Sequence, residues 1–510
     1  MNCQNSITLG PKIDLKQFLA VARGGAAVGF SDEYKARVRK SRVLIEQAIN
    51  EGRAIYGVTT GFGALSVNAV RQDESARLQH NILLSHAVSV GAPLSPEQAR
   101  ATMLMVLQNL GQGKSGVRLE VLRCIRDMLN KGLAPWMPQE GSVGYLAPEA
   151  HMALVVPGEG KAWWKGELLS GRQAMGKAGI KPVQLAAREG LALISGTTSA
   201  TALAALALYD MINAAKTADI IGAVSLESQK GVLDAFDEHL MSVRPHKDQG
   251  ATADNIRRML DGSEVLEHYK GQRLQDALSL RCIPQLHGAA KKTLYDAKET
   301  VEIELNSCCD NPIIIENDGN ADVLSGCNCD SAYIGLAMDS AAIASTMIAK
   351  MSERRNSRFL DQNLSGYPYF LAKNPGINSG LMIPQYTQAG LLGDMRILCT
   401  PSVTDNTPTS CNQEDYVAMG YNSSKKAIKI AENLEYILAI ELLSGYQSQQ
   451  FLDPKLKRGI VTSKIIETLS EHIPFFEHDV YLYPYIELIR QLIHDGTLLS
   501  IAENLVGELG

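Results

Sequence analysis

The chain has 510 residues, of which 45% are hydrophobic and 20% are charged, which is typical of a globular protein with a sizeable core. This composition excludes a disordered chain, a collagen-like repeat and a miniature disulfide scaffold. Because 49 basic residues face 55 acidic ones, the net charge is −6, and nothing in the charge balance indicates nucleic acid or an anionic membrane as a partner.

The nine cysteines are odd in number and form no paired CxxC framework, and the N-terminal residues lack the layout of a signal peptide. We therefore expect a cytoplasmic chain with reduced thiols. Cys308-Cys309 and Cys327-Asn328-Cys329 are the nearest approach to a soft-metal site, but no histidine lies close by in the sequence. We predict no metal and no organic cofactor. The longest apolar run, at 191–208, is interrupted by serines and threonines, so no membrane span is expected.

Along the chain, a loop-rich helical part at 1–190 precedes a helical body at 191–510, which we expect to form one interlocked unit. Gly111–Gly116 (GQGKSG) fits a GxGxxG pattern but follows a helical pattern, so we expect a turn. Helical spacing of apolar and small residues predicts long helices over 186–230, 332–355 and 425–449. The strand signal is weak and is clearest at 312–315 (PIII). The pattern predicts an all-α fold with a long central helix bundle.

Five segments concentrate glycine and polar residues in apolar surroundings: 55–65, 78–90, 141–152, 274–288 and 409–420. Tyr56, in a glycine-rich loop, is a candidate base; a phenolate needs its pKa lowered from about 10, so a nearby cation is expected. Arg281 offers a planar fork for a carboxylate. His86 and Glu414 are suited to hydrogen-bonding a polar ring. Each residue alone also fits a structural role, as a loop anchor, an ion-pair partner or a core histidine.

Taken together, the segments indicate a protein family more specifically than any one residue does. YGVTTGFG, LLSHA, GSVG–LAPEAHMAL, EGLALISGT, QDALSLRC, NSGLM and NQEDYVAMG occur in this order over most of the chain. This order resembles the aromatic amino acid ammonia-lyase family, and Ser85-His86 and Glu414 resemble the choices of its histidine branch. The resemblance implies an all-α fold of the fumarase/aspartase type, a homotetramer, and active sites built from several subunits.

The sequence departs from the family pattern where that family's electrophile forms. Family members carry Ala-Ser-Gly-Asp between GSVG and LAP, and the Ala-Ser-Gly cyclises into a methylidene-imidazolone; here Gly144 is followed directly by Tyr145. The supporting asparagine of the family's LNGT motif is Ser195. The second catalytic tyrosine, in the PYSLR motif, is Leu278, and the phenylalanine that packs against the electrophile is Cys329.

Three explanations are open. A matured electrophile left out of the printed sequence explains the gap but not Ser195, Leu278 or Cys329. A non-catalytic homologue acting as a scaffold does not explain why residues such as Tyr56 and Arg281 remain. A lyase whose substrate needs no electrophile explains both observations.

Chemistry favours the third explanation. The electrophile activates ammonia as a leaving group by bonding the lone pair of the substrate's amine. A quaternary ammonium has no such lone pair, and it leaves as a neutral trialkylamine. With a histidine-type pocket, this points to a histidine betaine: we expect elimination of trimethylamine from ergothioneine (2-thiohistidine betaine), giving thiolurocanate. The sulfur-free betaine hercynine has the same leaving group, and no residue distinguishes the two.

In the expected mechanism, Tyr56 removes the β-proton and Arg281 holds the carboxylate. Glu414 and Lys373 hydrogen-bond or protonate the ring, which accepts charge. Tyr145 faces the trimethylammonium group by a cation–π contact, with Asp330 either adding negative charge there or capping the following helix. The further candidate substrate-binding residues are Ser85, His86, Ser195 and Asn328.

Overall fold

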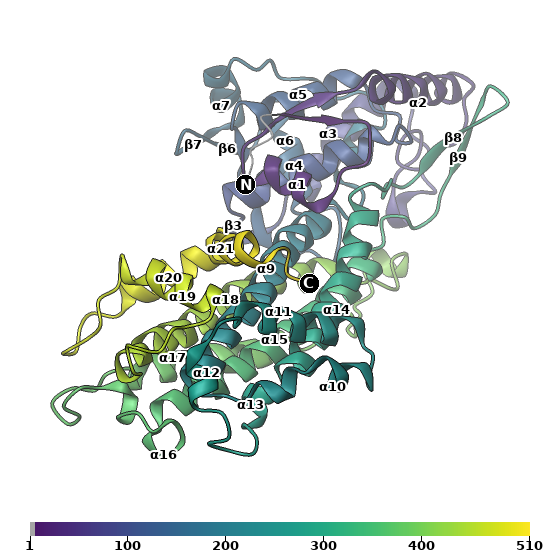
Figure 1. Cartoon of the computed structure of the whole chain (residues 1–510). Coiled ribbons are helices and arrows are strands. Elements are labelled where there is room, and N and C mark those ends of the chain that lie inside the picture. Colours follow the sequence, from purple (N-terminus) through teal and green to yellow (C-terminus); the bar gives the residue numbers. More distant parts are fainter. Residues whose placement is uncertain (1–5) are drawn as a thin grey trace. The chain divides into compact units, whose positions relative to one another are not determined.

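The structure is a computed structural model that describes residues 6–510 (Figure 1). It is mostly helical, as predicted. Residues 6–510 also form four small sheets of two or three strands, of which the sequence pattern indicated only the strand near 312–315. The described chain separates into two compact units: residues 6–207, 298–339 and 401–426 form the first, and 208–297, 340–400 and 427–510 form the second. The expected boundary at 190/191 falls inside helix α8 of the first unit.

The first unit contains all nine strands of residues 6–510, together with helices of up to 19 residues. Its elements are β1 (Ser6–Leu9), α1 (Leu15–Ala22), β2 (Ala27–Phe30), α2 (Asp32–Asn50), α3 (Ser75–His86), β3 (Val90–Pro93), α4 (Pro96–Gly111), α5 (Leu119–Asn130), β4 (Ala134–Pro135), β5 (Pro138–Glu140), α6 (Glu149–Val155), β6 (Lys161–Trp164), β7 (Glu167–Ser170), α7 (Gly171–Ala178), α8 (Glu189–Ile194), β8 (Ile313–Asn317) and β9 (Asn320–Leu324).

The second unit is helical. Its elements are α10 (Glu238–Ser242), α11 (Lys247–Met259), α12 (Glu264–His268), α13 (Leu278–Arg281), α16 (Gln362–Ser365), α17 (Met382–Leu398), α19 (Ile460–Ser470), α20 (Tyr483–His494) and α21 (Thr497–Val506). Four long helices have residues in both units: α9 (Thr198–Ser228), α14 (Ile283–Glu304), α15 (Ala332–Leu360) and α18 (Gly420–Ser448).

The long helices match the sequence prediction, with one informative difference. The segments predicted at 332–355 and 425–449 are α15 and α18, and the predicted strand is β8. The segment predicted at 186–230 is two helices, α8 and α9, with a break at Ser195–Thr197. Gly196 lies in this break at φ +113°, and a Cβ there would stand 2.8 Å from the Cys309 carbonyl oxygen, so only glycine fits.

The core of the first unit explains how the early loop is held. Apolar residues of α2 pack against the β8–β9 hairpin and the segment 55–58, and Figure 1 shows the hairpin beside α2. The buried members are Leu44, Ile45, Ala48, Ile49, Ile55, Val58, Ile314 and Ala321. The segment that carries Tyr56 is therefore anchored on both sides by buried apolar residues. Gly111–Gly116 ends α4 and forms a turn, as predicted.

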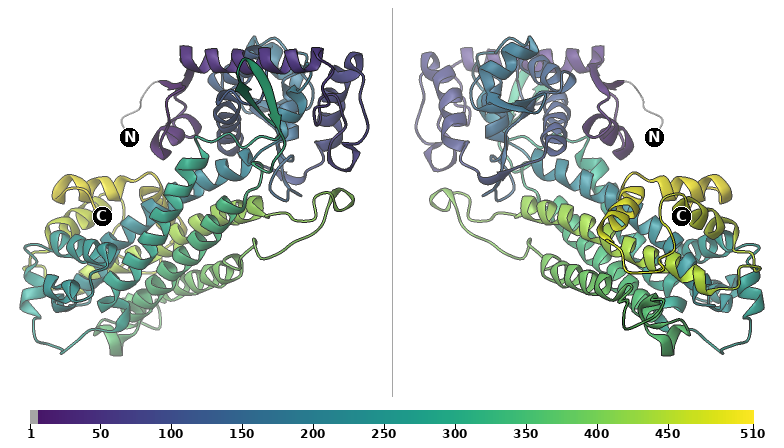
Figure 2. Two further views of the ribbon diagram at one scale, coloured as in Figure 1. Left: turned by 90° about the vertical axis from the view of Figure 1, so that its right-hand side faces the viewer. Right: turned by 90° about the vertical axis from the view of Figure 1, so that its left-hand side faces the viewer.

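In the second unit, the long helices lie side by side (Figure 2). Arg355 of α15 makes a bidentate ion pair with Glu441 of α18, and Ser225 of α9 donates to the same carboxylate at 2.6 Å. Two helical stretches, 189–228 and 332–360, are long and apolar enough to cross a bilayer. The most apolar window of the first is wholly buried within the protein and that of the second is 61% buried, which is typical of core helices.

Candidate active site

Tyr56 lies in the loop before α3, and its hydroxyl oxygen accepts a 2.8 Å hydrogen bond from the backbone N–H of Gly63. Burial is the main reason why the pKa of Tyr56 is above its ordinary value, and the negative charge of Glu414 adds to this increase. The Gly63 N–H and the positive charge of Arg188 oppose it. The expected cation is thus present, but within one chain it does not overcome burial, so the expectation of a lowered pKa is wrong there.

Glu414 is brought to the same place by a tight loop at 409–414. The backbone of Thr409 exchanges hydrogen bonds with that of Glu414, and Ser410 accepts from the Ala64 N–H at 3.3 Å. Oε2 of Glu414 is buried without a hydrogen-bond partner among the described residues. The role of Glu414 in binding a polar ring stays a prediction.

Ser85 and His86 end α3. Nδ1 of His86 lies 2.8 Å from the Ile82 carbonyl oxygen, and because a carbonyl oxygen can only accept, Nδ1 must carry the proton and donate. The Ser85 hydroxyl donates to the same oxygen. The tautomer leaves Nε2 as an acceptor, and burial lowers the pKa of His86, which favours the neutral imidazole. The Phe62 ring lies 5.2 Å from the imidazole, so this histidine faces the Tyr56 loop.

Tyr145 stands in the shortened loop and is half-buried. Burial raises its pKa well above the ordinary value, and the acidic groups Cys329, Glu414, Cys327 and Asp330 raise it further. A phenol that is held neutral among acidic groups is a favourable neighbour for a cation. Burial likewise raises the pKa of Cys329, to about 12, so its thiol is neutral at physiological pH.

The electrophile does not fit this loop, because Gly144 is bonded directly to Tyr145 and no Ala-Ser-Gly is available to cyclise. Ser195, at the position of the asparagine that supports the electrophile in the family motif, makes a different contact here. Its hydroxyl accepts the backbone N–H of Asn311 at 3.1 Å. Ser195 therefore has a structural contact in the break between α8 and α9, and the structure records no contact of it with Tyr56 or Tyr145.

Asp330 and Asn328 lie just before α15. A carboxylate oxygen of Asp330 accepts the Ala332 N–H at 2.8 Å, so Asp330 caps this helix start, and its charge also acts on Tyr145. The two roles that the sequence left open are compatible. Asn328 is exposed, and its side chain makes only a long 3.5 Å contact with the Cys308 carbonyl oxygen, which leaves its role as a prediction.

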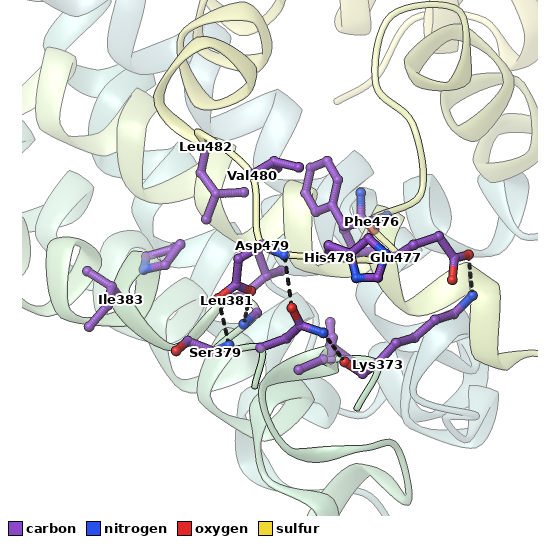
Figure 3. Close-up of a pocket in the computed structure, with 16 residues that line it drawn as sticks. Lys373, Ser379, Leu381, Ile383, Phe476, Glu477, His478, Asp479, Val480 and Leu482 are labelled. Carbon is purple, nitrogen blue, oxygen red and sulfur yellow. Dashed lines mark hydrogen bonds and ion pairs between the residues drawn. The ribbon is translucent and has the colours of Figure 1, made fainter. Parts of the chain in front are cut away.

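Arg281 and Lys373 belong to the second unit. Arg281 ends α13, where Nε donates to the Asp276 carbonyl oxygen at 3.0 Å, and the described residues show no hydrogen bond of its terminal nitrogens. Its role in holding a carboxylate stays a prediction. Lys373 forms an ion pair with Glu477 and lines a pocket of about 180 Å³ (Figure 3). Asp479, from the same lining segment as Glu477, accepts the backbone N–H groups of Ser379 and Gly380, both at 2.8 Å (Figure 3).

Glu149 and Arg188, which the sequence analysis did not single out, are among the fully buried charged residues of the first unit. Oε1 of Glu149 accepts from the Thr198 hydroxyl at 3.0 Å and the Ser199 N–H at 2.8 Å at the start of α9, whereas Oε2 has no partner among the described residues. Burial raises the pKa of Glu149. The only available signal was a charged residue inside an otherwise apolar motif.

Glu149→Gln is expected to stabilise the fold at pH values above the ordinary carboxyl pKa of 4.5, because glutamine keeps the Oε1 contacts without a buried charge. The amide nitrogen of the glutamine would be left without a partner, as Oε2 is, so the expected gain comes from removal of the buried charge. Since the folded-state pKa lies above the ordinary 4.5, the wild type loses stability as the pH rises from 4.5 through that raised pKa. Urea unfolding at several pH values should show a difference that grows with pH. Glu74→Gln, at an exposed carboxylate, is the control, and a pH-independent difference for Glu149→Gln would contradict the assignment.

Potential metal ligands gather elsewhere. Among residues 6–510, Asp210, Glu435 and His494 of the second unit are the one group of three whose ligand atoms lie within 4.8 Å of one another. Arg490 already contacts Glu435 at 3.0 Å, which supplies a positive charge to this group. The eight cysteines of the described chain are all free, and Cys3 lies outside it.

Comparison with known proteins shows the family and the fold of this chain. The family described as aromatic amino acid lyase matches residues 13–471. Histidine ammonia-lyase of Natranaerobius thermophilus is 41% identical over 504 residues, covering 98% of this chain and 99% of the relative.

Two solved structures are informative. Histidine ammonia-lyase from Trypanosoma cruzi matches with a TM-score of 0.91 and 34% identity, covering 97% of this chain and 94% of that one. The ergothioneine-degrading enzyme ergothionase from Treponema denticola matches with a TM-score of 0.89 and 27% identity, covering 97% and 99%. The chain belongs to the aromatic amino acid lyase family, whose members include carbon–nitrogen lyases, and it has the helical fold of histidine ammonia-lyase.

Proposed function

We propose that this chain is a carbon–nitrogen lyase that eliminates trimethylamine from ergothioneine without an electrophile, as an ergothionase. The observation that carries the proposal is the direct bond between Gly144 and Tyr145, which leaves no residues from which the electrophile could form. The substitutions at Ser195, Leu278 and Cys329 support it, since the residues that normally surround the electrophile are changed as well.

The second candidate is a histidine ammonia-lyase whose matured electrophile is left out of the printed sequence. Overall similarity favours this candidate, because relatives of that name are about 40% identical, whereas the ergothionase structure is 27% identical. Whole-chain identity is dominated by scaffold positions, however, and the choice of leaving group depends on a few residues in one loop. We therefore give the local residues more weight.

The surroundings of Tyr145 suit a quaternary ammonium. The neutral phenol lies among acidic groups that include Glu414 and Asp330, and a cation over its ring gains about 0.5–2 kcal/mol, depending on desolvation. A trimethylammonium group needs no covalent activation, and the shorter loop leaves more room for its methyl groups.

The reaction then follows as a β-elimination. Tyr56, as phenolate, takes the β-proton, the C–H electrons form the Cα–Cβ double bond, and the C–N electrons leave with trimethylamine. Arg281 holds the carboxylate, and Glu414 with Lys373 stabilises the charge that develops in the thioimidazole ring. Ser85, His86 and Asn328 line the ring pocket.

The assembly is part of the proposal. Arg281 and Lys373 belong to the second unit and the other candidate residues to the first. The proposed assembly is a cytoplasmic homotetramer in which each site takes residues from several copies. On α17, the apolar side chains of Ile383, Tyr386 and Ile397 are 56%, 66% and 75% exposed. A second copy of the chain would cover such a face. We propose a small-molecule betaine as the only substrate class, with no nucleic acid or membrane partner.

Incubation of the purified protein with ergothioneine, hercynine and histidine tests the proposal. Release of trimethylamine from ergothioneine, with the absorbance of a conjugated acrylate and no ammonia from histidine, is the expected result. Ammonia from histidine, together with an intact mass that includes an electrophile, would establish the second candidate. A preference for hercynine would make the sulfur-free betaine the substrate. No reaction with any of the three compounds would favour a non-catalytic scaffold protein.

Tyr145→Leu provides a second test of the same assignment. Loss of the cation–π contact is expected to weaken ergothioneine binding by about 3- to 30-fold, while leucine still fills the loop. Steady-state kinetics should show the change in KM for the trimethylammonium substrate, and a dimethylamino analogue should be affected less at a pH where it is uncharged. Equal effects on both substrates would remove Tyr145 from the ammonium pocket.

A further inference from the structure

Lys373 lies in the loop before α17, residues 370–380, and the backbone of this loop is strained. Phe370, Leu371 and Asn374 have left-handed φ values of +57°, +55° and +52°, which are rare for residues with side chains. Such conformations persist only where the surrounding structure holds them, and they gather at functional sites. The contacts that hold this loop therefore bear on the position of Lys373.

Asp479, 100 positions beyond Ser379 in the chain, contacts three consecutive residues of the loop (Figure 3). Oδ2 of Asp479 accepts the Ser379 N–H and Oδ1 accepts the Gly380 N–H, both at 2.8 Å. The backbone N–H of Asp479 donates to Oδ1 of Asn378 at 3.2 Å, and Nδ2 of Asn378 donates to the Lys373 carbonyl oxygen at 2.6 Å. The contacts of one aspartate thus extend to the backbone of Lys373 itself.

The ammonium group of Lys373 is bound by a second acid of the same segment. Nζ donates to Oε1 of Glu477, and the two side chains are 36% and 63% exposed (Figure 3). Exposed ion pairs contribute little to stability, because water screens them and the side chains lose freedom. The main consequence of this pair is therefore the direction in which it holds the ammonium group.

The segment that carries both acids is itself fixed to the long helix α18. Gln447 of this helix is buried, and its Oε1 accepts the Phe476 N–H at 3.1 Å. Its Nε2 donates to the Pro474 carbonyl oxygen at 3.0 Å. Hydrogen bonds therefore connect the helix to the segment and the segment to the strained loop, so the position of Lys373 is determined by the helical core of the second unit.

We propose that Asp479 and Glu477 are positioning residues for Lys373, in which Asp479 fixes the strained loop and Glu477 directs the ammonium group. This inference rests on the proposed function in so far as Lys373 stabilises charge in the substrate ring. Both acids act through Lys373, and neither is assigned a contact with the substrate. Placement matters for such a step, since a displacement of about 1 Å can lower a rate by about 10²-fold.

A double-mutant cycle tests the action through Lys373. Asp479→Asn leaves one backbone N–H facing an amide nitrogen, and it is expected to lower kcat for trimethylamine release by about 10- to 100-fold. Lys373→Met is expected to lower kcat by about 10²-fold or more. Both changes together should lower it no further than Lys373→Met alone, whereas independent structural effects would multiply. Asp453→Asn is the control, because Asp453 accepts a backbone N–H in another exposed turn of the unit and should not affect kcat.

Two further measurements need no substrate. Amide hydrogen exchange at Ser379 and Gly380 should be about 10-fold faster in Asp479→Asn, since one of these groups loses its acceptor. In Glu477→Gln, N-hydroxysuccinimidyl acetate should acetylate Lys373 about two- to fivefold faster, because the ion pair no longer shields the amine. Mass spectrometry of the peptides measures this rate, with the exposed Lys455 as the internal control.

Each outcome decides for or against the inference. Unchanged hydrogen exchange in Asp479→Asn, or kcat losses that multiply in the double variant, would show that it is wrong. If Asp479→Asn does not fold, Glu477→Gln decides, because an unchanged acetylation rate of Lys373 overturns the inference. If the wild-type protein eliminates nothing, the proposed function fails, whereas the exchange and acetylation rates still decide whether the two acids position Lys373.

Discussion

Tyr56→Phe is expected to lower the rate of trimethylamine release from ergothioneine by about 10²–10⁴-fold, the usual contribution of a general base. Phenylalanine keeps the ring and the loop packing but removes the group that accepts the β-proton. Because the pKa of Tyr56 is raised, only a small fraction is ionised near neutrality, so the wild-type rate should rise with pH. The variant should lose this increase, which a pH–rate profile measures.

A matched control exists in the same unit. Tyr34 is fully buried, and its hydroxyl donates to the Leu107 carbonyl oxygen at 2.7 Å. Tyr34→Phe therefore loses a hydrogen bond, at about 1 kcal/mol of stability, with no effect expected on turnover. If Tyr56→Phe retains the wild-type rate and pH dependence, another group removes the proton and the assignment of the base is wrong.

Arg281→Met is expected to lower kcat/KM for ergothioneine by about 10²–10³-fold, which is the second large effect. The substrate carboxylate would lose both charge-assisted hydrogen bonds from the terminal nitrogens, and loss of one partner of a buried charge pair costs about 2–5 kcal/mol. Arg281→Lys should recover only part of the activity, since an ammonium cannot reproduce the bidentate geometry.

The carboxylate itself supplies the control for Arg281. A decarboxylated analogue should bind wild type and Arg281→Met equally, which isothermal calorimetry can measure even without turnover. Arg244→Met, at an exposed arginine of the same unit, should leave the kinetics unchanged. A loss that is equal for ergothioneine and the analogue would mean that Arg281 supports the fold instead of the carboxylate.

The long helices could be predicted from the sequence alone, because the 3.6-residue repeat of apolar residues is a local property of the chain. It was also sufficient for the shortened loop, since the absence of residues between Gly144 and Tyr145 is a covalent fact. The family resemblance brought Tyr56, His86 and Glu414 together as candidates. The structure places Glu414 where its charge acts on both Tyr56 and Tyr145.

Tertiary structure determines the burial, the hydrogen-bond partners and the pKa shifts of those residues. The break between α8 and α9 depends on the close approach of Gly196 to Cys309, more than 100 positions away. The raised pKa of Tyr56 comes from burial, and the opposing cation, Arg188, lies 132 positions along the chain. The burial of a side chain and the electrostatic field at it depend on neighbours from distant segments of the chain, so a local sequence pattern cannot predict them. Helical periodicity and covalent connectivity depend on consecutive residues, so they can be read from the sequence.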